Sequence, residues 1–189
     1  MRKTIFLPMI LLILLLQTPK SYSLIYVGIG GDYIIPVAKL DEVNLDAFGF
    51  NLQLESRTYC KLWYGLRFDY ITLDAKKPIT EDYYKSMMLI SPTLRYNFLS
   101  HNCIDYTGKI APYVQGILTL SSIEGSDKKN LMGFGGGLGA GIAVGFQLFK
   151  TCMMFDLNGL YSAPNFITRA DGRPPLQMMN VNLSLSVGL

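Results

Sequence analysis

The sequence predicts an all-β fold, an eight-stranded antiparallel up-and-down transmembrane β-barrel that follows a cleaved signal peptide. Three observations support this prediction. Eight segments alternate apolar and polar residues, and a β-strand sends successive side chains to opposite faces. The polar connections between most of these segments are alternately long and short along the chain. The last segment, residues 179–189, alternates up to the final residue. Because an unpaired apolar edge invites aggregation, we expect this segment to close the barrel on the first strand.

The first 23 residues have the pattern of a signal peptide. Arg2 and Lys3 form a basic start, residues 5–16 are an unbroken apolar run, and Ser21 and Ser23 supply small residues for cleavage. We expect cleavage after Ser23. The alternative is a retained transmembrane helix, but such a helix needs roughly 20 apolar residues. The predicted organisation is therefore a signal peptide at 1–23 and one barrel domain at 24–189.

The charge balance changes when this leader is removed. Three of the 17 basic residues lie in it, whereas all 14 acidic residues follow it. The mature chain therefore has a net charge near zero. Nucleic-acid binding would need a basic patch or stripe, which this balance does not support.

The first four strands are expected at residues 24–33, 45–57, 59–73 and 85–98. Each has one apolar row and one row of small, polar or charged residues. The apolar rows include Ile25, Val27, Ile29, Phe48, Phe50, Leu52, Leu62, Leu66, Phe68, Met88, Ile90 and Leu94. Pro92 lies on the apolar row of the fourth strand, where it removes a donor from the hydrogen-bond ladder.

The last four strands are expected at residues 109–121, 131–149, 153–161 and 179–189. Alternation is weakest in the first of these. Residues 131–149 contain no charge and carry glycines every four residues, which is the spacing of a transmembrane helix dimerisation face. Gly135 and Gly139 fall between those glycines, and the even positions are nearly all apolar, so period two favours a strand.

The connections between the strands indicate an orientation. Long polar connections are expected at residues 36–44, 74–84, 122–130 and 164–175, and short turns near Thr58 and Lys150. Outer-membrane barrels have long extracellular loops and short periplasmic turns. The turn at residues 100–108 is longer than this rule expects.

Alternation alone does not separate a membrane barrel from a soluble one such as a lipocalin, which keeps its apolar residues inside. The polar rows favour a membrane barrel over a soluble one, because they carry charges of both signs that can pair in a closed, narrow lumen. Glycines at odd positions of 131–149 leave room for long side chains opposite. Aromatic residues near strand ends fit the interfacial girdles of such barrels: Tyr33, Tyr70, Phe98, Phe149 and Tyr161.

The candidate site is this polar network of the lumen. Its members are Glu55, Lys61, Arg67, Asp69, Arg95 and Asp156. Such a set could line a proton or ion path. An eight-stranded barrel is only just wide enough for its side chains, however, so we predict a structural salt-bridge network that fills the lumen.

With these features the chain resembles the small eight-stranded bacterial outer-membrane barrels of the OmpA and OmpX type. The resemblance covers residues 24–189 and rests on the strand count, the loop asymmetry and the closing strand. It implies a location in the bacterial outer membrane, with outer-membrane lipid and the outer-membrane assembly machinery as partners. Such barrels usually end on an aromatic residue that the assembly machinery reads, whereas this chain ends on Leu189.

No cluster of residues predicts catalysis, a metal or a cofactor. Outer-membrane lipid A deacylases and palmitoyltransferases have a wall His and Ser, but His101 lies in a polar turn and lacks the flanking pattern of a deacylase. Cys60, Cys103 and Cys152 map to the periplasmic ends of strands. A disulfide between Cys60 and Cys103 is possible in an oxidising compartment, and three free thiols are the alternative.

These observations lead to a functional hypothesis. We expect a non-enzymatic outer-membrane barrel with a role in envelope integrity or surface interaction through its extracellular loops, whose partner the sequence does not identify. A lipid-modifying outer-membrane enzyme and a narrow, porin-like channel are the alternatives. We expect no appended peptidoglycan-binding module after residue 189.

Overall fold

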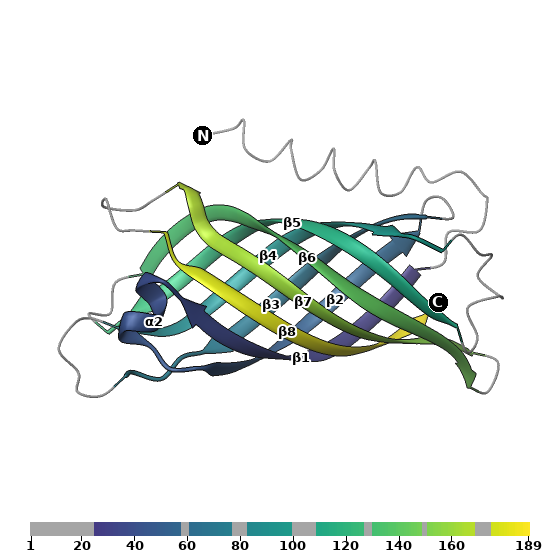
Figure 1. Ribbon diagram of the computed structural model, residues 1–189, viewed down its shortest axis with the longest axis horizontal. Coiled ribbons are helices and arrows are strands. Elements are labelled where there is room, and N and C mark those ends of the chain that lie inside the picture. The colour runs from purple at the N-terminus through teal and green to yellow at the C-terminus, as the bar shows by residue number, and fades with distance from the viewer. Residues whose placement is uncertain are drawn as a thin grey trace, which may run out of the picture.

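The computed structural model describes residues 25–57, 61–76, 83–99, 109–126, 130–148, 151–168 and 175–189. They form a closed antiparallel barrel in which each strand pairs with its neighbours in sequence (Figure 1). The strands are β1 (Ile25–Val37), β2 (Ala47–Arg57), β3 (Leu62–Thr72), β4 (Tyr84–Asn97), β5 (Ile110–Gly125), β6 (Asn130–Leu148), β7 (Thr151–Thr168) and β8 (Gln177–Gly188). The predicted number and order of strands are confirmed.

The closing strand pairs with the first strand, as expected. The register of β1 and β8 runs from Tyr26 opposite Gly188 to Val37 opposite Gln177. The amide of Leu189 adds a hydrogen bond of 2.8 Å to the carbonyl of Ile25. β1 begins and β8 finishes at the same end of the barrel, which we name the terminal end (Figure 1). The opposite end is named the loop end.

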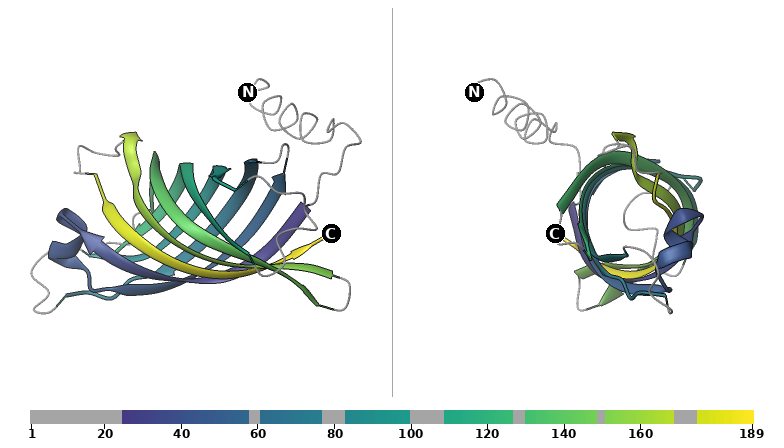
Figure 2. Two further views of the ribbon diagram at one scale, coloured as in Figure 1. Left: turned by 45° about the vertical axis from the view of Figure 1, so that its right-hand side comes forward. Right: turned by 90° about the vertical axis from the view of Figure 1, so that its left-hand side faces the viewer.

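The strands are staggered around the barrel. From Gly30, the register pairs through β2, β3 and β4 lead to Ser121 of β5, whereas those through β8, β7 and β6 lead to Ala111 of the same strand. This offset of about ten residues corresponds to strands tilted by roughly 40°, and it leaves an interior that side chains can fill. Figure 2 shows the barrel along its axis.

The two faces of the wall separate apolar from polar side chains. Polar residues of every strand except the glycine-rich β6 are buried inside, and the large apolar residues of the alternating rows are exposed outside. The outer face includes Val27, Ile29, Phe50, Leu52, Leu66, Ile90, Leu94, Leu118, Leu138, Leu157, Val181, Leu183 and Leu185. Of the aromatic residues expected in girdles, Tyr33, Phe98 and Tyr161 are exposed on this wall, and Phe149 lies outside the described residues.

The Gly-rich stretch is strand β6, which confirms the predicted strand and excludes the alternative of a transmembrane helix. It pairs with β5 from Asn130 to Val144 and with β7 from Phe134 to Leu148. In the part of the chain that the structure describes, the one helix is too short to cross a membrane. Pro92 is tolerated within β4, since the β4–β5 register is the same before it, where Ile90 lies opposite Leu120, and after it, where Thr93 lies opposite Ile117.

Three expected loop boundaries are wrong. Residues 36–44 contain the end of β1 and a helix, α2 (Lys39–Val43), and β5 and β7 continue to Gly125 and Thr168. The strands extend because their inward residues still find partners: Ile123 is 1% exposed, and Asn165 accepts a hydrogen bond of 2.7 Å from the amide of Leu176. The polar residues at the ends of β1, β5 and β7 therefore belong to the rim of the barrel and not to loops.

The loop end of the interior is apolar, which the alternation did not predict. Buried apolar side chains fill this end, and we name this cluster the apolar plug. Leu40 of α2 is one of its members and is fully buried. Ala38, with a φ of 53°, turns the chain from β1 into α2. The other members of the plug are Ile34, Ala47, Ile71, Leu73, Tyr84, Met87, Leu89, Ile123, Leu176 and Met178.

Candidate functional site

The candidate site is the charged middle of the barrel interior, between the apolar plug and the terminal end. Its side chains come from the inward rows of β1, β2, β3, β4, β5, β7 and β8. They form two clusters, each built around one arginine.

The first cluster surrounds Arg67 of β3. Its guanidinium donates to Asp32 at 2.5 Å and to Asp69 at 2.6 Å. Asp32 also accepts from the amide groups of Asn51 at 2.7 Å and Asn182 at 3.2 Å. All five side chains are nearly inaccessible to solvent. A buried charge needs this kind of pairing, because an uncompensated one costs several kcal/mol.

The second cluster surrounds Arg95 of β4. One nitrogen, Nη1, lies 2.8 Å from Asp156 and 3.4 Å from Glu55. Asp156 also accepts from the Tyr113 hydroxyl at 2.5 Å and from Asn158 at 3.1 Å. Asp156 is therefore satisfied by three different donors, whereas the contact with Glu55 is long.

Aromatic rings hold the Arg95 side chain in place. Its guanidinium carbon lies 3.5 Å from the centroid of the Tyr113 ring and 5.1 Å from that of Trp63. Both distances suit cation–π contacts. Tyr26 stacks on Trp63 with ring centroids 5.2 Å apart, toward the terminal end of the interior.

A glycine of β6 makes room for the Tyr113 ring. A Cβ at Gly141 would lie 2.6 Å from ring atoms of Tyr113 and 2.6 Å from the carbonyl oxygen of Leu157. The space that the glycines of this strand provide is thus used by the tyrosine on which Arg95 rests.

Two asparagines connect the clusters. Asn158 donates to Asp156 and, at 3.1 Å, to the side-chain oxygen of Asn182. Asn182 in turn donates to Asp32 of the first cluster. The polar interior is therefore one continuous network that crosses the lumen.

The structure brings together five of the six residues predicted for this network: Glu55, Arg67, Asp69, Arg95 and Asp156. Lys61 is partly buried just before β3, and its carbonyl accepts from the amide of Asn97. No ion pair among the described residues includes the Lys61 ammonium group.

Sequence analysis missed three central members of the network. Asp32, Tyr113 and Asn182 all lie on the polar rows of their strands, so alternation placed them inside. Their roles as links between charges depend on which strands face each other across the lumen. Period-two alternation within a strand does not contain that information.

The remaining candidate residues fall largely outside the described chain. His101, Cys60 and Cys103 are not among the described residues, so the possible disulfide stays a prediction. Cys152, at the start of β7, is a free and partly buried thiol. The described residues contain no group of His, Cys, Asp or Glu arranged to hold a metal ion.

The geometry defines a class of protein: a closed eight-stranded transmembrane barrel with an apolar outer wall and a filled, charged interior. This is the fold of small outer-membrane barrels. The chain is similar in structure to neisserial surface protein A, with 14% sequence identity and a TM-score of 0.60 over 86% of this chain and 96% of that one.

Designed transmembrane β-barrels match over 90% of this chain and 98% of theirs, with 9% identity and a TM-score of 0.42. No protein-family model matches the sequence, and no curated protein matches it. At these identities, the likeness to neisserial surface protein A shows the fold alone.

Proposed function

We propose that the protein is a non-enzymatic barrel of the bacterial outer membrane, which acts in envelope integrity or surface interaction through the loops at its loop end. In this proposal the terminal end faces the periplasm. Outer-membrane lipid surrounds the wall, and the outer-membrane assembly machinery inserts it.

The filled interior is the observation that carries this proposal. The apolar plug occupies the loop end of the lumen, and the two arginine clusters occupy its middle. Such an interior favours a rigid support over a transport path, because ions would have to cross an apolar layer. In rigid scaffolds, function is concentrated in the loops.

The experiment is complementation of a deletion strain with loop variants. Residues 77–82 or 169–174 are replaced by Gly/Ser segments of equal length, and sensitivity to detergent and adhesion to surfaces are measured. We expect at least one variant not to restore the wild-type behaviour of the deletion strain, while its protein still shows the boiling-dependent gel mobility shift of a folded barrel. Full complementation by every loop variant would contradict a role for the loops.

The lipid-modifying enzyme remains the alternative to test. Mass spectra of lipid A from cells with and without the gene separate the two functions. The proposal expects identical spectra, and a change in acyl chains that depends on the gene would overturn it.

A further inference from the structure

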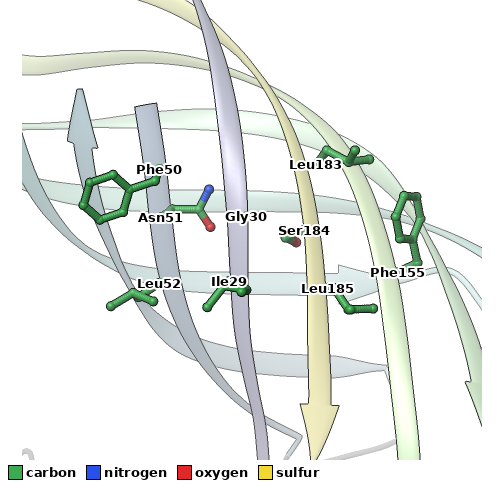
Figure 3. A pocket seen from close by; sticks show the side chains of 9 residues that line it. All are labelled: Ile29, Gly30, Phe50, Asn51, Leu52, Phe155, Leu183, Ser184 and Leu185. Atoms are coloured by element: carbon green, nitrogen blue, oxygen red, sulfur yellow. The ribbon is translucent and has the colours of Figure 1, made fainter. Parts of the chain in front are cut away.

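The outer wall carries an apolar groove of about 500 Å³ that crosses four strands. In Figure 3 the rings of Phe50 on β2 and Phe155 on β7 lie at its two sides, with β1 and β8 between them. The groove is lined by Ile29, Gly30, Phe50, Asn51, Leu52, Phe155, Leu183, Ser184 and Leu185.

A missing side chain explains the hollow. Gly31 is exposed on the outward row of β1, and its register partners are Phe50 on one side and Leu183 on the other. A Cβ at this position would come no closer than 3.9 Å to its nearest neighbour, the carbonyl oxygen of Gly49. Local packing therefore does not require glycine here, and a larger side chain would fill the space between Phe50 and Leu183.

The groove lies in the membrane-facing wall and nearer the terminal end on three of its four strands. Ile29 is closer to the first residue of β1 than to its last, Phe155 is closer to the first residue of β7, and Leu185 is closer to the last residue of β8. Those three strand ends all belong to the terminal end of the barrel.

The chemistry of the lining selects the occupant. The lining contains no charged residue, and its two polar side chains bond to the interior: Asn51 donates to Asp32, and Ser184 accepts from Gln53. A stable interface with a second copy would need about 20–30 residues on each side, far more than line this groove. A single hydrocarbon chain needs neither charge nor a large area.

We propose that this groove binds one acyl chain of a phospholipid from the leaflet at the terminal end. The barrel holds this lipid more tightly than the lipids around the rest of the wall, because the chain contacts β2, β1, β8 and the Phe155 ring of β7 at once.

The test is native mass spectrometry of the purified full-length barrel after exchange into detergent and addition of palmitoyl-oleoyl-phosphatidylethanolamine. Three proteins are compared: wild type, Gly31→Leu and Gly159→Leu. Gly159 is a matched control, because it is also exposed on the outer wall and a Cβ added there would meet no atom within 4 Å. We expect a one-lipid peak for wild type and Gly159→Leu, and its loss for Gly31→Leu.

The boiling-dependent gel shift verifies that each variant is folded. If Gly31→Leu does not fold, Leu183→Trp fills the groove from β8 and carries the same expectation. A one-lipid peak that persists when the groove is filled would overturn the proposal, as would its absence from wild type. A dimer peak would also overturn it. So would retention of lipopolysaccharide in place of phosphatidylethanolamine when the two lipids are added together. None of these outcomes depends on the role proposed for the loops.

Discussion

Asp156 and Glu55 share one partner, Arg95, but have different surroundings. Asp156 accepts from Arg95, Tyr113 and Asn158, whereas among the described residues Glu55 accepts from Arg95 alone, at 3.4 Å. The number of donors around each carboxylate therefore indicates which charge the barrel interior depends on.

This difference gives a paired prediction. Asp156→Asn should lower the free energy of unfolding by about 2–4 kcal/mol, because it leaves a buried guanidinium and a hydroxyl poorly matched. Glu55→Gln should cost less than about 1 kcal/mol, since it loses one long contact. Urea unfolding in phospholipid bilayers measures both. Equal losses would mean that donor number does not rank these carboxylates.

Gly141 gives a second prediction at this scale. Gly141→Ala should cost about 1–3 kcal/mol, because the new methyl group overlaps the Tyr113 ring that supports Arg95. Gly159→Ala, on the open outer wall, should have little effect. With Tyr113→Ala already present, the cost of Gly141→Ala should fall, although the contact with the Leu157 carbonyl remains. Strictly additive losses would show that the ring contact is not the cause.

Sequence analysis placed most residues of the site on the correct face but did not assign their partners. Arg67 and Arg95 were expected inside because each lies on a polar row. Asp32 was not assigned to the network, because its bond to Arg67 spans from β1 to β3. Contacts between non-adjacent strands depend on tilt and stagger, which no single strand specifies.

At the scale of the element, α2 and the segment that follows it close the loop end. Asn44 is fully buried and donates to the carbonyls of Asp74 at 3.1 Å and Tyr84 at 2.7 Å. Its side-chain oxygen accepts from the amide of Tyr84 at 3.2 Å. One asparagine thus ties the α2 segment to the ends of β3 and β4, above the apolar plug.

Asn44→Ala should loosen this end alone. It leaves buried backbone groups of Asp74 and Tyr84 without partners, at a cost of about 1–3 kcal/mol. Hydrogen exchange should accelerate at residues 40–45, 74–76 and 84, while amides near Arg95 keep their protection. Asp41→Asn is the control, because the Asp41–Lys76 ion pair is exposed and worth little. Faster exchange throughout the barrel would contradict a local role.

Neither α2 nor the apolar plug could be predicted from the periodicity. Five helical residues are too few to produce a helical pattern, and charged residues around Leu40 make the segment resemble a loop. The plug consists of apolar residues on rows that are polar farther down the same strands, such as Ile34 above Asp32 on β1. Alternation describes a whole row, so it does not detect a change of chemistry along the barrel axis.

At the scale of the whole molecule, stagger and alternation combine into a closed wall around a filled interior. The strand count, the antiparallel order and the closing pair were predictable, because they follow from period-two alternation and from the need to remove edges. The predicted signal peptide at residues 1–23 lies outside the described residues and stays a prediction.

The filled interior predicts that the barrel does not conduct ions. Reconstituted in a planar lipid bilayer, the full-length protein should give no discrete current steps at potentials where a porin in the same bilayer opens. The physical reason is the apolar plug, together with the buried ion pairs below it. Reproducible unitary openings would contradict this account of the lumen and favour the narrow channel.

The central claim is that apolar rows face lipid and polar rows face the lumen. Spin labels placed one at a time at residues 179–187 of β8, with the native cysteines replaced by serine and the protein in phospholipid bilayers, test it directly. Accessibility to oxygen, which concentrates in lipid, should peak at the odd positions such as Val181 and Leu183 and be low at the even positions such as Asn182 and Ser184. High oxygen accessibility at the even positions, or no period of two, would contradict the account.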